Sequence, residues 1–296
     1  MPVAQNFTYV KPKALDDAVA LLAEHGANAR VLAGGTDLAL KIKEGAETPD
    51  VVIDIKGIEA LRSIRVQDGR VHVGALVSFT QITEDEHILD TCPLLRDAAA
   101  TVGSVGIRNR ATLAGNICSA VPSLDSGPTL LVHEAQVHVK NVQSERTVPI
   151  GEWFTGPKRC ALEAHDLVTG ISLPVPESAY AGSYVKLGRY SGEDLAQAGV
   201  GVLALADRTY RVAFCAVGPI PKRSQQLEQL LNGNAISDAL IEEAKALIPE
   251  EISPITDIRS TKEYRTLMAK VMFERGLKLA VERLNGNDAH HGALWV

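Results

Sequence analysis

The sequence predicts an α+β fold built from two domains. The period of the apolar residues switches several times between the helical and the strand pattern, and strand-like runs near residue 200 are followed by long helical stretches. Two prolines, Pro174 and Pro176, interrupt the pattern between these parts. At 296 residues the chain is long enough for two domains. We therefore expect a first domain over residues 1–177 and a second over residues 178–296.

The first domain is expected to consist of two lobes, residues 1–58 and 59–177. In the first lobe, Ala18, Leu21 and Leu22 have helical spacing and Gly26 ends that helix. The elements expected there are strand Asn6–Val10, helix Ala14–His25, strand Arg30–Ala33, helix Asp37–Glu44 and strand Val51–Ile55.

In the second lobe, alternating residues on either side of Asp68-Gly69 predict a β-hairpin, because this dipeptide favours the tight turn that joins two antiparallel strands. A proline at its start favours a helix from Pro93. The elements expected are strands Ile64–Val66 and Val71–Val73, helix Pro93–Val102, a loop over Gly103–Asn116, helix Pro128–His133 and strand Gln136–Val142.

The second domain is expected to form an antiparallel sheet that helices cover on one side. Its predicted strands are Ser183–Leu187, Ala198–Ala206 and Arg211–Val217, and its predicted helices are Ala239–Leu247 and Lys262–Leu284.

Composition excludes several classes of partner. The net charge of −6 and the absence of a Lys/Arg block argue against nucleic acid, and aromatic residues at 4% argue against a stacking platform for single strands. The apolar runs are too short to span a bilayer, so we expect no membrane contact. None of the four cysteines forms a CxxC pair, which favours a reduced, cytoplasmic protein without a metal of its own.

Two glycine-bearing loops are the most informative motifs. AGGTDL covers Ala33–Leu38 and TLAGNICS covers Thr112–Ser119. Glycine allows close approach of the backbone and a positive φ, so that successive amides can form a concave nest for phosphate oxygens. Neither a G-x-G-x-x-G fingerprint nor a Walker A lysine is present, which disfavours a Rossmann or P-loop domain. The loops therefore predict a dinucleotide site of another fold, with Asp37 as a cap for the helix that follows.

Taken together, these loops resemble those of the flavin-binding medium subunit of molybdenum hydroxylases, the family of carbon monoxide, xanthine and nicotinate dehydrogenases. The first loop matches in full, and GIRNRATLAGN over residues 106–116 matches the second, with Gly106 and Ala114 as departures. The matches continue with Asp125, nine positions after Asn116, and with Tyr184-Val185-Lys186, Gly218–Arg223 and Glu263-Tyr264-Arg265.

The resemblance implies a two-lobed FAD-binding domain of the vanillyl-alcohol-oxidase (PCMH) type, followed by a small α+β domain. It implies non-covalent FAD, a large molybdenum-cofactor subunit and a small subunit with [2Fe-2S] clusters, arranged as a dimer of heterotrimers. Electrons would pass from the clusters through FAD to NAD⁺ or another acceptor. The residues that it assigns to cofactor binding are Ala33, Gly34, Gly35, Thr36, Asp37, Arg108, Asn109, Thr112, Ala114, Gly115, Asn116, Ser119, Asp125 and Lys186.

Several of these residues have an alternative role. Asn116 is a cradle residue or a turn stabiliser. Asp125 binds a ribose or ribityl hydroxyl, or it caps a helix. Arg108 binds phosphate, or it holds the loop through backbone carbonyls. Lys186 tunes the flavin, or it is a solvated strand lysine.

Two further features favour roles outside catalysis. Cys118 is interpreted as a packing residue rather than a redox thiol. The pair His290-His291 is interpreted as part of an exposed tail rather than a metal site.

Three functions remain open at this point. The first is the electron-transfer subunit of a molybdenum hydroxylase. The second is a free-standing flavoenzyme with its own small substrate, and the third is an assembly module without flavin. The sequence does not identify the substrate.

Overall fold

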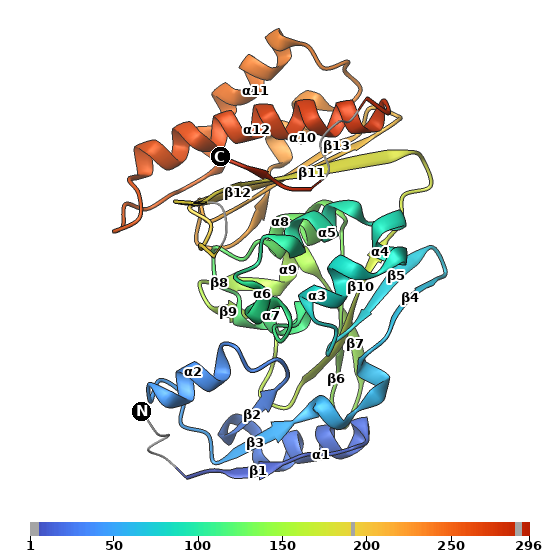
Figure 1. The fold of residues 1–296 in the computed structure, drawn as a ribbon, viewed down its shortest axis with the longest axis vertical. Helices are drawn as coiled ribbons and strands as arrows, with labels where there is room; N and C mark the ends of the chain where they lie inside the picture. The colour runs from blue at the N-terminus through green and yellow to red at the C-terminus, as the bar shows by residue number, and fades with distance from the viewer. Residues whose placement is uncertain (1–5, 191–192, 288–291) are drawn as a thin grey trace.

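The computed structural model describes residues 6–190, 193–287 and 292–296. The amino-terminal lobe lies at one end of an elongated molecule, the helix-rich second lobe occupies the middle, and the carboxyl-terminal domain lies at the other end (Figure 1). Within the described residues, no helix is long and apolar enough to cross a bilayer. The α+β class predicted from the sequence is confirmed.

The first lobe is a three-stranded parallel sheet in the order β1-β3-β2. Strand β3 is central and fully buried, because β1 and β2 pair with its two edges and α1 packs against it. The elements are β1 (Thr8–Val10), α1 (Leu15–His25), β2 (Ala29–Leu32), α2 (Leu38–Lys43) and β3 (Val51–Asp54), with short 3₁₀ turns at Gly26–Asn28, Ile55–Gly57 and Glu59–Leu61. The first glycine loop leaves the carboxyl end of β2 and leads into α2.

The second lobe is built on a five-stranded antiparallel sheet in the order β4-β5-β10-β6-β7. The predicted hairpin is confirmed, since Asp68 and Gly69 take φ values of 52° and 66° between β4 and β5. On β5 and β6, valines point into the core and polar residues point away from it. The strands are β4 (Ile64–Gln67), β5 (Arg70–Gly74), β6 (Gln136–Lys140), β7 (Glu145–Pro149) and β10 (Leu167–Pro174), with a small β8 (Phe154–Gly156) and β9 (Arg159–Cys160) hairpin.

Short helices of this lobe connect the strands and carry the second glycine loop. They are α3 (Phe79–Glu84), α4 (Glu86–Thr91), α5 (Pro93–Ala100), α6 (Val105–Arg108), α7 (Leu113–Ser119), α8 (Ser126–Val132) and α9 (Ile150–Trp153).

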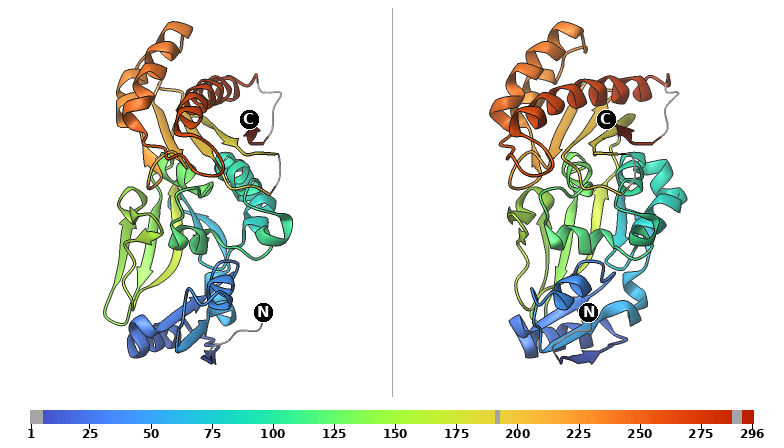
Figure 2. Two further views of the ribbon diagram at one scale, coloured as in Figure 1. Left: turned by 90° about the vertical axis from the view of Figure 1, so that its left-hand side faces the viewer. Right: turned by 60° about the vertical axis from the view of Figure 1, so that its left-hand side comes forward.

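The second domain is a five-stranded sheet in the order β14-β13-β12-β11-β15. Almost every residue of β11 and β12 is buried, which requires a cover on both faces. Helix α12 packs along one face, and α5 and α8 of the first domain pack against the other (Figure 2). The elements are β11 (Tyr180–Leu187), β12 (Ala198–Leu205), β13 (Tyr210–Cys215), β14 (Lys222–Arg223), α10 (Gln225–Leu231), α11 (Asp238–Glu251), α12 (Lys262–Leu284) and β15 (Leu294–Trp295).

Three expectations from the sequence need correction. The second sheet is covered on both sides, because the first domain supplies the second layer of helices. It is also not purely antiparallel, since β15 pairs with β11 in parallel. The stretch expected as a loop over Gly103–Asn116 contains α6 and the first turn of α7, because Ser104 and Thr112 cap those helices with their side chains. The boundary after residue 177 remains a prediction.

Candidate functional site

Both glycine loops face one cavity of about 960 Å³ between the two lobes of the first domain. This volume is at the upper end of the range of about 300–1,000 Å³ that is typical of small-molecule and cofactor sites. Most of the predicted cofactor residues line it: Ala33, Gly34, Gly35, Thr36, Asp37, Thr112, Ala114, Gly115, Asn116, Ser119 and Asp125. The fold thus brings together segments that lie about eighty residues apart in the sequence.

The first loop needs its glycines for two different reasons. A Cβ on Gly34 would lie 2.1 Å from the carbonyl oxygen of Arg110, so the loop passes directly against the backbone that precedes α7. Gly35 has φ +80°, in the left-handed region that residues with a Cβ rarely adopt. At these two positions the loop therefore has only backbone beside the cavity.

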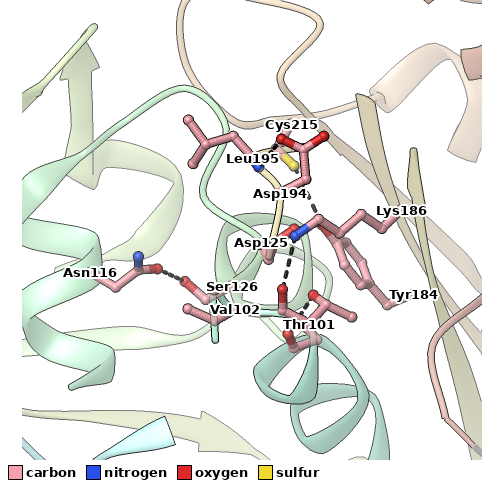
Figure 3. Close-up of polar contacts among 12 residues, drawn as sticks. Thr101, Val102, Asn116, Asp125, Ser126, Tyr184, Lys186, Asp194, Leu195 and Cys215 are labelled. Carbon is pink, nitrogen blue, oxygen red and sulfur yellow. Dashed lines mark hydrogen bonds and ion pairs between the residues drawn. The ribbon is translucent and has the colours of Figure 1, made fainter. Parts of the chain in front are cut away.

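The second loop is organised by Thr112. Its hydroxyl accepts a hydrogen bond from the Gly115 amide at 3.0 Å and caps α7, so Ala114, Gly115 and Asn116 form the first turn of that helix beside the cavity. The Asn116 side chain accepts a hydrogen bond from the Ser126 hydroxyl at 2.6 Å (Figure 3). Asn116 therefore fixes α7 to the start of α8.

Asp37 joins the two loops. Its carboxylate accepts a hydrogen bond from the hydroxyl of Ser119, at the end of α7. The expected capping role is wrong, because Asp37 occupies the cap position of α2 but makes no capping hydrogen bond through its side chain. The contact instead connects the first lobe to the second at the edge of the cavity.

Asp125 lies on the cavity wall, but its carboxylate is held by the second domain (Figure 3). The Tyr184 hydroxyl donates to one carboxylate oxygen at 2.7 Å, and the Lys186 ammonium donates to the other at 2.9 Å. Burial raises the pKa of the Asp125 carboxyl, and the Lys186 charge and the Tyr184 hydrogen bond oppose that rise. Like Asp37, Asp125 occupies a cap position without a capping hydrogen bond from its side chain, so the capping alternative is wrong.

Lys186 is fully buried, so the alternative of a solvated lysine is wrong. Its ammonium also donates to the carbonyl oxygen of Thr101 at 2.9 Å and lies 5.1 Å from the centre of the Trp295 ring. Together with the Asp125 carboxylate, these contacts compensate the positive charge of Lys186, which is buried between the two domains.

Arg108, Asn109 and Lys186 are the predicted site residues that do not line the cavity. Arg108 donates to the carbonyl oxygens of Val102 and Gly103, at 3.1 and 2.8 Å, as the loop-holding alternative describes. The Asn109 side chain accepts a hydrogen bond from the Thr80 hydroxyl. A direct role of these three residues toward a cofactor stays a prediction.

The remaining motifs hold the second domain together. Arg223 contacts Glu228 and also Glu134 of the first domain, both at 2.6 Å. Arg265 donates to Asp257 at 2.7 Å and to the carbonyl oxygen of Gln197 at 2.9 Å. These arginines therefore stabilise the domain and its contact with the first domain.

Some cavity-lining residues carry no motif that sequence reasoning could have used. The cavity also contacts Arg30, Lys41 and Glu47 of the first lobe, and residues 193–195 of the second domain. A further set of residues lies on the same wall: Lys158, Arg159, Cys160, Leu162, Glu163, Ala164 and Asp166. Such residues are placed by the fold alone.

Cys118 lies beside the cavity, within the part of the chain that the structure describes. Burial, and next the neighbouring Cys160, raise the pKa of the Cys118 thiol far above its ordinary value, which agrees with a packing role. Within the described ranges no group of three His, Cys, Asp or Glu side chains has the geometry to hold a metal ion. The pair His290-His291 lies outside the described residues.

Comparison with protein families gives two consecutive matches. Residues 5–176 match the FAD binding domain in molybdopterin dehydrogenase, and residues 183–280 match the CO dehydrogenase flavoprotein C-terminal domain.

Similar proteins span nearly the whole chain. The caffeine dehydrogenase subunit beta of Pseudomonas sp. (strain CBB1) is 30% identical, over 97% of this chain and 98% of that protein. The xanthine dehydrogenase FAD-binding subunit of Escherichia coli O157:H7 is 28% identical, over 94% and 97%. A solved structure of carbon monoxide dehydrogenase from Hydrogenophaga pseudoflava matches with a TM-score of 0.91 and 31% identity, over 96% and 99%.

Proposed function

We propose a specific electron-transfer role for this chain, which belongs to the family of FAD-binding subunits of molybdenum hydroxylase-type dehydrogenases. In this proposal the chain would hold FAD, which would supply the electron-transfer chemistry between the [2Fe-2S] clusters of a small partner subunit and NAD⁺. A large partner subunit holds the molybdenum cofactor and oxidises the substrate, and the complex is a cytoplasmic dimer of heterotrimers. The meeting of both glycine loops at one cavity is the observation that carries the proposal.

The residues present fit FAD. Gly34 has no room for a side chain, so the first loop packs against the backbone before α7, and its own backbone amides can lie close to a phosphate group. The cavity volume of about 960 Å³ suits a large cofactor. Asp125 lies at the cavity wall, and each carboxylate oxygen has a second lone pair besides the one used toward Tyr184 or Lys186, which could accept a hydrogen bond from a sugar or ribityl hydroxyl. These features together match a pyrophosphate flanked by hydroxyl-bearing groups.

In the proposed mechanism the protein binds and orients, and FAD supplies one-electron and hydride-transfer chemistry when bound. Gly34 and Gly35 would let the first loop hold the pyrophosphate, and Thr112 would keep the first turn of α7 in place at the same cavity. Asn116 keeps that turn against α8, and Asp125 holds a hydroxyl of the cofactor. No side chain of this chain needs to exchange a proton with a substrate.

The names of the relatives support placing the substrate in another subunit. Similarly related proteins are named for caffeine and xanthine, which are both purines, and for carbon monoxide, which has no chemistry in common with them. A chain that binds only the common electron carrier accounts for this range of names.

The test is an anaerobic titration of the FAD-loaded chain with NADH, followed through the visible flavin absorption. We expect NADH to bleach the flavin, and the assembled complex with its partner subunits to reduce NAD⁺ when it is given its substrate. A flavin that NADH leaves oxidised, but that a quinol reduces, would overturn NAD⁺ as the acceptor. Reduction of the isolated chain by a purine or an aldehyde would overturn the division of labour between subunits.

A further inference from the structure

Resting on the proposed FAD-binding function, we propose that Tyr184 is a positioning residue: it fixes the Asp125 carboxylate at the cavity wall, so that FAD retention depends on the second domain. Tyr184 is fully buried and does not line the cavity, so it acts through Asp125 and not by contact with the cofactor. Among the described residues, the second domain itself contributes only Glu193, Asp194 and Leu195 to the cavity wall.

The contact is built into the strand β11. Tyr184 and Lys186 are two residues apart, so both side chains leave the same face of the sheet, the face that packs against α5 and α8. Their hydroxyl and ammonium groups reach the two different oxygens of Asp125, at 2.7 and 2.9 Å (Figure 3). The carboxylate is therefore held at both oxygens and cannot rotate without losing a partner.

Two glycines in the neighbouring strand β12 make this approach possible. Gly199 pairs with Lys186 in the register of the sheet, and Gly201 pairs with Tyr184. A Cβ on Gly199 would lie 2.6 Å from the Tyr184 hydroxyl, and a Cβ on Gly201 would lie 2.9 Å from the Cβ of Pro128 on α8. Side chains at these two positions would displace the tyrosine hydroxyl and push α8, which follows directly after Asp125, away from the sheet.

The hydrogen bond also bears on the charge of Asp125. Burial raises the pKa of this carboxyl, while the Lys186 charge and the hydrogen bond from Tyr184 lower it. Without the hydroxyl, the carboxyl would take up a proton at a higher pH than it does in the wild type. A protonated carboxyl is a weaker acceptor for a cofactor hydroxyl, so binding by the variant would weaken more than that of the wild type as the pH falls.

The experiment measures the dissociation constant of FAD for the full-length apoprotein by quenching of flavin fluorescence. Tyr184→Phe keeps the buried ring and removes only the hydroxyl. We expect the dissociation constant to rise about tenfold, the effect of losing one hydrogen bond to a charged group. The rise should become larger as the pH is lowered. Tyr210→Phe, on β13, is the matched control and should leave FAD binding unchanged, because the Tyr210 hydroxyl donates to Asn234 in the part of the domain away from the cavity.

A double-mutant cycle separates positioning through Asp125 from a general structural effect. In an Asp125→Ala background the hydroxyl has no carboxylate to hold, so adding Tyr184→Phe should weaken FAD binding no further. If Asp125→Ala does not fold, Asp125→Asn replaces it, and the Tyr184→Phe effect should then shrink well below its wild-type size.

Two results would overturn the inference while the wild type binds FAD: an unchanged dissociation constant in Tyr184→Phe, or an equally large Tyr184→Phe effect with and without Asp125. A wild-type chain that binds no FAD would instead refute the proposed function itself.

Discussion

The cavity wall and the contact between the domains solve two different physical problems with different residues. At the cavity wall, small residues such as Gly34 and Gly35 expose backbone. Between the domains, charged side chains are buried and paired, as Lys186 is with Asp125 and as Arg283 is with Asp97 at 2.8 Å. A binding surface must remain open to an anion, whereas a dry contact must satisfy every charge it encloses. The glycine loop and the motif that contains Lys186 are equally clear in the sequence, but the first lines the cavity and the second joins the two domains.

The largest effect should come from breaking the buried ion pair between the domains. Replacing Lys186 by methionine leaves the Asp125 charge buried without its cation, and breaking such a pair costs about 3–5 kcal/mol. We expect a clear fall in the free energy of unfolding, measured by urea denaturation of the apoprotein. Lys140→Met is the control, because Lys140 pairs with the exposed Asp16 and Glu145, and it should unfold at nearly the wild-type urea concentration. Equal stability of both variants would contradict a dry, charge-dependent contact.

Acid should weaken the same region through His133. This residue ends α8, is buried, and has neither ring nitrogen hydrogen-bonded in the described part of the chain. Burial, and then the Arg211 charge, lower the pKa of His133 to about 4. In the unfolded chain a histidine binds its proton near pH 6.5. The folded state, which keeps His133 neutral, therefore has its full stability above pH 6.5 and loses stability as the pH falls toward 4.

Between pH 7 and 4.5 the expected loss from this histidine is about 2–3 kcal/mol. Urea denaturation of the wild type and of His133→Leu at both pH values measures it. On acidification, the free energy of unfolding of the leucine variant should fall by about 2–3 kcal/mol less than that of the wild type. The same pH dependence in both proteins would show that another group is responsible.

A substitution in the glycine loop at the cavity wall should lower the free energy of unfolding by less, and its main effect should be on FAD binding. Gly34→Ala places a methyl group against the Arg110 carbonyl, and overpacking of this kind costs about 1–3 kcal/mol. We expect lower FAD occupancy in a folded protein, measured by the ratio of flavin to protein absorbance. In Gly151→Ala, where no atom lies within 4 Å of the added methyl, occupancy should remain that of the wild type. Full occupancy in Gly34→Ala would show that the loop does not approach the cofactor.

The same contrast explains what the sequence could predict. Local signals were sufficient for the hairpin at Asp68-Gly69 and for α12, whose bounds at Lys262 and Leu284 match the prediction. Both glycine loops were assigned to one cofactor site because the glycines of each loop allow backbone amides to approach a phosphate group. The family identified by resemblance is confirmed by the matches over residues 5–176 and 183–280.

What sequence reasoning missed depends on partners that lie far away along the chain. The second layer on the carboxyl-terminal sheet comes from α5 and α8, and nothing in the strands indicates which helices cover them. Strand β10 was not predicted, although it pairs with β5 and β6 at the centre of its sheet. The burial of Lys186 follows only from its distant partners Thr101 and Asp125.

The measurement that tests the central claim most directly is the visible absorption spectrum of the purified full-length chain and of its Gly35→Val variant, with chromatography of the chromophore that heating releases. The two loops are proposed to hold FAD through backbone that Gly35, at φ +80°, makes accessible. The account predicts flavin bands and released FAD from the wild type, and a folded but nearly colourless variant. A wild type that is colourless and takes up no added FAD, or a variant with full flavin content, would contradict it.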